Sequence, residues 1–323
     1  MKTTSFAGID TAISRIVQGS LGLIWGTDAE AFAVLDAAVE SGITAFDTAH
    51  IYDFDDRGVD RLLGRWLSGR GDRDQLVLMA KGCHPDHEGN ARVVPAAISD
   101  DISDTLERSG LERLDLWSFH RDDPGVPIGE LVDAVNAEVA SGRISAWGVS
   151  NWTTGRIRDA LDYAAKEARV GPVANSAHYS LAAQLAPPWD DVVTLTGRDA
   201  EPDRQWHRDV GLPVVAWSSL AGGFLSANVT RSDLEQPDDD HFAEVARCYA
   251  NVENWARRDR AATVADERGV SLSQVAVAWV LGDDMSTLAI TGGATIDEVR
   301  QNAAAAEIEL TRDERRAILE GPA

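Results

Sequence analysis

Four polar side chains stand at the ends of three successive β-like segments and could together transfer a proton. Asp47 ends the segment GITAFD, and Tyr52 follows five residues later. Lys81 ends LVLMAK, and His120 ends LDLWSFH. In a parallel barrel the strand ends of one face converge on a single mouth, so we expect these four side chains to meet there. A buried Asp, Lys or His is costly unless it is paired, and a shared chemical role explains why all three stand together.

The chemistry that fits these residue types is acid–base catalysis at an oxygen atom. The pKa of a tyrosine is ordinarily about 10, which is too high for efficient proton transfer near neutral pH. We expect the ammonium group of Lys81, held in place by Asp47, to stabilise the tyrosinate and lower the pKa of Tyr52. His120 can hydrogen-bond a substrate oxygen and fix it beside the Tyr52 hydroxyl. Such a set protonates a carbonyl oxygen while hydride reaches the carbon, or removes the alcohol proton in the reverse direction.

Short β-like runs alternate with helix-period segments along the whole chain. The expected strands are Ile16–Gln18, Ala45–Asp47, Leu76–Lys81, Leu114–Phe119, Ala146–Val149, Val173–Asn175, Val214–Trp217 and Thr287–Ile290. The expected helices include Asp28–Ser41, Val59–Leu67, Pro95–Ser109, Ile128–Ser141, Thr153–Glu167, Ala261–Arg268 and Ser271–Leu281. Thr27 and Asp28 form a helix-start signal, and Gly42, Gly142 and Gly269 are stop signals just past helix ends.

Eight strands separated by helices predict a parallel sheet buried on both faces, and eight is the number that closes a barrel. The alternation also allows an open doubly wound sheet, but we favour a (β/α)8 TIM barrel formed by residues 1–323 as one domain. Two connections, Leu181–His207 and Phe224–Arg260, are longer than ordinary βα loops. Both follow strands, which puts them on the C-terminal face, and we interpret them as ligand-covering loops rather than neutral insertions.

The composition indicates a soluble protein and argues against several classes of partner. Hydrophobic residues make up 44% of the chain and charged residues 26%. The net charge of -23 argues against binding to nucleic acid or to an anionic membrane. No apolar run is long enough to span a bilayer and the N-terminus has no signal pattern, so we expect a cytoplasmic protein. Cys83 and Cys248 cannot form a disulfide framework or a cysteine-based zinc site.

Taken in order, the segments GITAFDTAHIYD, LVLMAKG, LDLWSFHRDDP and WGVSN resemble the successive signatures of the aldo-keto reductase superfamily, in its bacterial form. The resemblance runs over nearly the whole chain. It implies a (β/α)8 barrel that interconverts a small-molecule carbonyl and its alcohol with NADP(H) or NAD(H). Tyr52 is then the general acid and base. Asp47 and Lys81 assist it, and His120 orients the substrate.

The resemblance also implies a set of cofactor-binding positions, although the Rossmann GxGxxG fingerprint is absent. Ser150 and Asn151 match the pair that binds the nicotinamide carboxamide. Trp217 stands where the family has a ring stacked on the nicotinamide, which orients one cofactor face toward the substrate. Small residues after it let backbone amides approach a pyrophosphate. The implied set is Ser150, Asn151, Ser176, Trp217, Ser218, Leu220, Gly222, Gly223, Gly292, Glu298 and Asn302.

Two places depart from the family pattern. Ser176 replaces a Gln, and its shorter side chain reaches less far toward a cofactor. In ITGGATIDEVRQN the family often supplies a Lys or Arg to the 2′-phosphate of NADP, whereas this chain has Gly292 and Glu298. A carboxylate repels a phosphate and suits ribose hydroxyls, so we predict that NAD(H) is bound at least as well as NADP(H). Arg300 or Arg231 could supply the missing charge.

The pattern says less about the substrate. The residues expected around it are Trp25, Tyr52, His84, Asp86, His87, His120 and Trp152. The two tryptophans would form apolar walls, and the His and Asp side chains of the segment after the third strand could hydrogen-bond hydroxyls. Such a pocket suits a sugar, a polyol or a similar polyhydroxylated carbonyl, and equally an aryl aldehyde. The sequence does not indicate an oligomeric state.

Other chemistries fit these residues less well. The spacing of His84 and His87 beside Asp86 matches no zinc template, so we expect no metal site. Cys83 has no identifiable base, and we expect a buried thiol rather than a nucleophile. A Schiff base at Lys81 is disfavoured because an Asp partner keeps the amine protonated. The main alternative is a non-catalytic barrel that binds a nicotinamide cofactor as a sensor or channel-associated subunit, and turnover separates the two.

Overall fold

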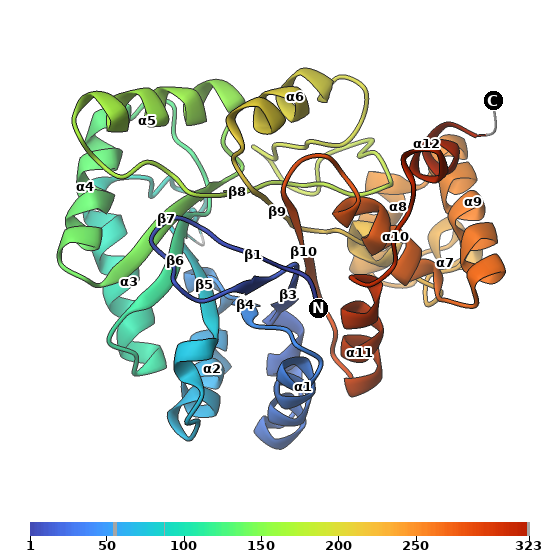
Figure 1. The fold of residues 1–323 in the computed structure, drawn as a ribbon, viewed down its shortest axis with the longest axis horizontal. Helices are drawn as coiled ribbons and strands as arrows, with labels where there is room; N and C mark the ends of the chain where they lie inside the picture. The colour runs from blue at the N-terminus through green and yellow to red at the C-terminus, as the bar shows by residue number, and fades with distance from the viewer. Residues whose placement is uncertain (54–56, 87, 322–323) are drawn as a thin grey trace.

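A closed parallel barrel forms the centre of the molecule (Figure 1). The computed structural model describes residues 1–53, 57–86 and 88–321, and within them eight strands pair in the order β10-β3-β4-β5-β6-β7-β8-β9. These strands are β3 (Ile16–Gly19), β4 (Ala45–Asp47), β5 (Val77–Gly82), β6 (Leu114–Phe119), β7 (Ile144–Ser150), β8 (Asn175–Ser176), β9 (Val214–Ala216) and β10 (Thr287–Thr291). The predicted (β/α)8 barrel is confirmed, and each predicted strand lies within two residues of its observed bounds.

Helices surround the barrel on its outer side (Figure 1). They are α1 (Asp28–Glu40), α2 (Val59–Ser68), α3 (Pro95–Ser109), α4 (Ile128–Ala140), α5 (Thr154–Lys166), α6 (Glu201–Val210), α9 (Val252–Arg268), α10 (Leu272–Leu281), α11 (Ile296–Ala305) and α12 (Arg312–Glu320). Local sequence sets where they begin: Thr27 and Glu30 cap each other across the first turn of α1, and Pro95 opens α3, where no backbone N–H is needed. No helix of the described residues is long and apolar enough to cross a membrane.

An N-terminal hairpin closes the end of the barrel from which the strands start. Its strands, β1 (Thr3–Thr4) and β2 (Ile13–Ser14), are antiparallel, and the hairpin runs across the barrel opening in Figure 1. Phe6, Ile9 and Ile13 are buried in one cluster with the inward side chains of the barrel strands, such as Met79. The sequence pattern did not predict this hairpin. It seals the barrel interior from one side, so the opposite face is the one left for ligands.

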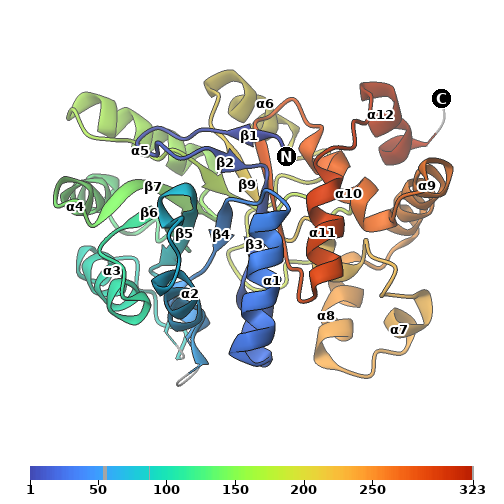
Figure 2. The ribbon, with the colours of Figure 1, turned by 60° about the horizontal axis from the view of Figure 1, so that its bottom comes forward.

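The C-terminal face carries the long connections and several short helices. The 3-10 turns η1 (Leu21–Trp25), η2 (His50–Tyr52) and η5 (Ala221–Gly223) follow β3, β4 and β9, whereas η4 (Arg73–Gln75) precedes β5. The connection after β9 contains α7 (Arg231–Glu235), α8 (Asp240–Tyr249) and the start of α9, so it is largely helical. In Figure 2, α7 and α8 lie on the side opposite the N-terminal hairpin.

A buried histidine joins the two long connections beneath this face. The Nδ1 atom of His178 is 2.6 Å from the Thr194 hydroxyl oxygen, and its Nε2 atom is 3.2 Å from the Tyr249 hydroxyl of α8. Burial lowers the pKa of His178 to about 3, so the ring is neutral at physiological pH. The neutral ring can donate one hydrogen bond and accept the other, which links the two segments. The His178 ring also packs on Trp217 at a ring-centroid distance of 5.1 Å.

Candidate active site

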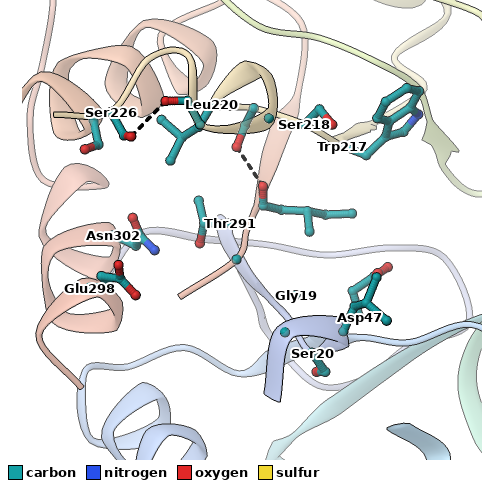
Figure 3. Close-up of a pocket in the computed structure, with 18 of the residues that line it drawn as sticks. Gly19, Ser20, Asp47, Trp217, Ser218, Leu220, Ser226, Thr291, Glu298 and Asn302 are labelled. Atoms are coloured by element: carbon teal, nitrogen blue, oxygen red, sulfur yellow. Dashed lines mark hydrogen bonds between the residues drawn. The ribbon is translucent and has the colours of Figure 1, made fainter. Parts of the chain in front are cut away.

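One cavity on the C-terminal face brings the four predicted catalytic side chains together. Its volume is about 800 Å³, and its lining includes Asp47, Tyr52, Lys81 and His120. The cavity is elongated: in Figure 3, Asp47 and Trp217 lie toward one end, whereas Glu298 and Asn302 of α11 lie toward the other. A volume of this order is typical of small-molecule and cofactor sites.

Asp47 and Lys81 form a buried ion pair at the base of the cavity. The Lys81 ammonium group donates to a carboxylate oxygen of Asp47 and, at 3.4 Å, to the carbonyl oxygen of Thr48. Both residues are 5% exposed. Asp47 ends β4, and Lys81 lies one residue before the end of the neighbouring strand β5. Burial raises the pKa of Asp47, and the charge of Lys81 opposes this shift. Each charge would be costly to bury alone, and the ion pair offsets that cost for both side chains.

Tyr52 lies in η2 beside His120, with ring centroids 6.1 Å apart and the rings nearly perpendicular. Burial raises the pKa of Tyr52, the charge of Asp47 raises it further, and the charge of Arg121 opposes them. The expected lowering of this pKa by Lys81 is therefore wrong for the ligand-free site, where desolvation and the carboxylate dominate. Tyr52 is protonated at neutral pH, and it can act as a proton donor.

His120 is the fourth member of this group and is neutral. Burial lowers its pKa well below the usual value, and the positive charges of Lys81 and Arg121 lower it further. Its Nδ1 atom is buried and has no hydrogen-bond partner among the described residues. A buried ring nitrogen without a partner, in a ring that packs edge-on to that of Tyr52, is a position at which a ligand oxygen or water can bind.

Most of the implied cofactor positions also line the cavity. The lining residues among them are Ser150, Asn151, Trp217, Ser218, Leu220, Gly222, Gly223, Gly292, Glu298 and Asn302. Asn151 donates to the Ser150 hydroxyl at 3.1 Å and to the His120 carbonyl at 3.3 Å, which ties this pair to the catalytic end. After Trp217 the backbone turns sharply, with φ of 48° at Ser218 and 63° at Gly222, as in anion-binding nests.

Ser176 does not line the cavity. It ends β8 and is 5% exposed, and its hydroxyl has no partner among the described residues. This position, which the resemblance implied for cofactor binding, therefore lies outside the cavity lining.

Glu298 caps its own helix. Its carboxylate accepts hydrogen bonds from the backbone N–H groups of Ala294 at 3.0 Å and Thr295 at 3.2 Å. The two arginines considered as substitutes for a missing basic group are engaged elsewhere and do not line the cavity. Arg231 pairs with Asp259 at 2.9 Å, and Arg300 lies 4.0 Å from Glu40.

The expected apolar walls are wrong. Trp152 is fully buried, donates to the Arg121 carbonyl at 3.0 Å and does not line the cavity. Trp25 is 67% exposed and also lies outside the lining. The wall is formed by Trp189, which stacks on Trp217 at a centroid distance of 5.3 Å. Its segment, LAPPWDD, has no periodic pattern, so no local signal predicts this contact.

Arg121 is a second lining residue that was not predicted from the sequence. It follows His120 directly at the end of β6, and a charged residue at that place was a usable signal.

The segment after β5 has no metal centre among the described residues. His84 packs against His120 at a ring-centroid distance of 4.9 Å, and Asp86 accepts hydrogen bonds from Asn90 in a local turn. Within the described ranges no group of His, Cys, Asp and Glu side chains is arranged to hold a metal ion, and His87 lies outside them. Cys83 is fully buried, and burial raises the pKa of its thiol, which removes it as a nucleophile.

A closed (β/α)8 barrel with ionisable side chains gathered in a cavity at its C-terminal face has the arrangement of a barrel enzyme. The model of the aldo/keto reductase family matches residues 15–320. The chain is 27% identical to the uncharacterized oxidoreductase YrpG of Bacillus subtilis (strain 168), over 97% of this chain and 93% of that protein. It is 25% identical to a probable voltage-gated potassium channel subunit beta of Arabidopsis thaliana, over 86% and 82%.

A solved aldo/keto reductase of Klebsiella pneumoniae, in complex with NADP and acetate, superposes with a TM-score of 0.72 at 28% identity. That alignment covers 100% of this chain and 96% of the other. The chain belongs to the aldo/keto reductase family, and it is an oxidoreductase.

Proposed function

We propose that this protein reduces an aldehyde or ketone to its alcohol with a nicotinamide cofactor, with Tyr52 as the proton donor. The observation that carries the proposal is the convergence of Tyr52, His120 and the Asp47–Lys81 pair in one cavity. That cavity continues past Trp217 to α11, so it offers room for an extended ligand as well as a small substrate.

The residues present fit a dinucleotide. At the catalytic end, the Ser150–Asn151 pair presents polar groups, and the Trp217 ring offers a flat apolar face. Farther along, the positive-φ turn after Trp217 exposes backbone amides, and Ser226 lines the same side (Figure 3). The Thr291 hydroxyl lines the cavity and has no partner among the described residues, as expected of a group that a ligand completes.

The side chains act on the substrate oxygen. A bound reduced nicotinamide cofactor supplies hydride to the carbonyl carbon. The Tyr52 hydroxyl donates its proton to the carbonyl oxygen, and the neutral His120 ring hydrogen-bonds the same oxygen and orients it. The Lys81 ammonium group, held by Asp47, stabilises the negative charge that Tyr52 acquires when its proton leaves.

We also propose that NAD(H) binds at least as well as NADP(H). Glu298 contributes a carboxylate to the cavity lining at the α11 end. This carboxylate already accepts hydrogen bonds from two backbone N–H groups, which are therefore not available to a phosphate. Among the described lining residues the only Lys and Arg side chains are Lys81 and Arg121, both at the catalytic end. The Klebsiella relative binds NADP, so the two chains are proposed to differ at this end.

Tryptophan-fluorescence titration with both cofactors tests the preference. Glu298→Gln keeps an amide oxygen for the cap and removes the charge, so we expect it to strengthen NADP(H) binding and to change NAD(H) binding by less than about twofold. Asp297→Asn, in the same helical turn but outside the lining, is the matched control. Tight and selective NADP(H) binding by the unaltered protein would overturn this preference.

Turnover tests the reaction itself. The protein with either reduced cofactor is assayed on sugars, polyhydroxylated carbonyls and aryl aldehydes, following loss of cofactor absorbance. Tyr52→Phe is expected to abolish turnover while cofactor binding persists. Tyr163→Phe, which removes a hydroxyl bonded to Asp133 on the outer surface, should keep full activity. Cofactor binding without turnover of any substrate would favour a non-catalytic, sensor-like barrel instead.

A further inference from the structure

Arg121 stands in the cavity as a buried cation without an anionic partner. It is 8% exposed and lines the cavity together with Tyr52 and His120. Among the described residues, no carboxylate lies within the 4 Å of an ion pair. The carboxylate whose charge acts on the pKa of Arg121 is that of Asp191, which is exposed. By contrast Arg156, on the adjacent α5, pairs with Asp122 at 3.1 Å. A buried guanidinium is expensive unless its charge and donors are satisfied.

The hydrogen bonds that Arg121 makes use only some of the N–H donors of its guanidinium. One terminal nitrogen donates to the His120 carbonyl at 2.8 Å, and the other lies 3.4 Å from Nε2 of His84. Two other arginines without a carboxylate use their donors on at least two backbone carbonyls each: Arg15 on Leu281 and Thr287, and Arg258 on Ser226 and Val229. A guanidinium has five N–H donors, and only one carbonyl engages that of Arg121.

The groups around Arg121 indicate which kind of ligand its guanidinium can bind. Its guanidinium lies over the Trp189 ring, 5.3 Å from the centroid, and this stacking fixes the guanidinium plane. Its charge also reaches Tyr52, so an anion bound to Arg121 lies near the proton donor. The protein as a whole carries a charge of -23, which disfavours the approach of an anion, and a local cation such as Arg121 offsets this repulsion.

We infer that Arg121 binds a carboxylate of the substrate, and that the preferred substrates are carbonyl compounds that also carry a carboxylate. The inference rests on the proposed function and narrows it to a substrate class. The carboxylate accepts from the free guanidinium donors while the carbonyl oxygen of the same molecule meets Tyr52 and His120. Trp189, 41% exposed, offers an apolar face for the carbon skeleton between the two groups.

Matched substrate pairs test this inference. The pairs are 4-carboxybenzaldehyde with methyl 4-formylbenzoate, and 4-oxobutanoate with butanal, in which a neutral methyl ester or methyl group replaces the carboxylate. We expect kcat/KM to be higher for the acid of each pair. Arg121→Gln should lower kcat/KM for the acids by roughly 10–100-fold and for the neutral partners by less than about threefold. Arg121→Lys, which keeps the charge, should restore part of the loss. Added salt should lower kcat/KM for the acids and leave kcat/KM for the neutral partners unchanged.

Two controls separate the possible roles of Arg121. Arg158→Gln removes an exposed positive charge over Trp206, outside the cavity, and should leave the preference for acids unchanged. If Arg121 served Tyr52 instead of the substrate, Arg121→Gln would lower kcat/KM equally for acids and neutral partners, and that result would overturn the inference. Reduction of neutral aldehydes with no preference for acids would overturn it as well, while leaving the proposed reductase intact.

A binding measurement keeps the test independent of turnover. Benzoate and benzamide are titrated into the protein with oxidised cofactor present, following tryptophan fluorescence. Benzoate is expected to bind more tightly than benzamide, and Arg121→Gln should abolish the difference. Equal binding of the two by the unaltered protein contradicts the carboxylate site. Failure of every aldehyde in the turnover assay contradicts the proposed reaction, and benzoate binding then still decides the role of Arg121.

Discussion

Removing one member of the Asp47–Lys81 pair should cost more stability than removing both. Lys81→Met leaves the carboxylate of Asp47 buried, at 5% exposure, with no cation bonded to it. Breaking a buried pair in this way typically costs about 3–5 kcal/mol, whereas replacing both partners with apolar groups is often close to neutral. We therefore expect Lys81→Met to be destabilised by about 3–5 kcal/mol and Asp47→Leu/Lys81→Met by about 2 kcal/mol less than that.

Urea unfolding followed by both fluorescence and circular dichroism measures these differences. Asp47→Leu alone completes the double-mutant cycle, from which the coupling free energy follows. Both probes are needed because a barrel of this size need not unfold in two states. We expect the double variant to be stable but inactive, which separates the structural role of the pair from its action on Tyr52. The reasoning is refuted if Lys81→Met loses less than about 1 kcal/mol, or if the single changes simply add.

Two buried groups away from the reacting oxygen should shift stability with pH in opposite directions. Burial lowers the pKa of His178 to about 3, whereas in the unfolded chain it is about 6.5. The stability of the fold is therefore full above pH 6.5 and is lost as pH falls toward 3, because the unfolded state binds a proton that the folded state does not. His178→Gln should make Tm fall less steeply between about pH 6.5 and pH 3. Asp60 is buried behind Thr48, and burial raises its pKa to about 6. The stability that goes with a neutral Asp60 is present below pH 4 and is lost as pH rises through 6. Compared with the unaltered protein, Asp60→Asn should therefore raise the free energy of unfolding by up to about 3 kcal/mol at pH 7.5 and leave it unchanged at pH 4. Unchanged Tm profiles for both variants would contradict these assignments.

The barrel could be predicted because its elements carry strong local signals. Strand β6 is a continuous run of six residues, all of them buried, and α3 begins at a proline and ends before a glycine in the left-handed conformation. The N-terminal hairpin could not be predicted, since β1 and β2 have two residues each and exist only through their pairing and the barrel end beneath them. The sequence predicts a loop where α7 and α8 lie, because acidic residues interrupt their apolar pattern.

The residues expected to be catalytic could be predicted for a similar reason, but the aromatic residues that line the cavity could not. Asp47, Lys81 and His120 each stand within one residue of a strand end, so the barrel topology alone brings them together. Trp189 reaches the cavity through its stacking on Trp217, a contact between two connections that no local pattern encodes. Trp152 follows the Ser–Asn pair in sequence but points into the core, where its ring packs on Phe119, because sequence proximity to a site does not fix side-chain direction.

The pH dependence of the reduction step tests the role of Tyr52 most directly. Stopped-flow measurement of a single turnover, with saturating reduced cofactor and a neutral aryl aldehyde, isolates the step in which the proton moves. We predict a rate independent of pH from about 6 to 9, because burial keeps Tyr52 protonated and His120 neutral throughout that range. A rate that falls with an apparent pKa between about 6.5 and 8.5 would contradict a protonated Tyr52 as the donor and assign the proton to another group.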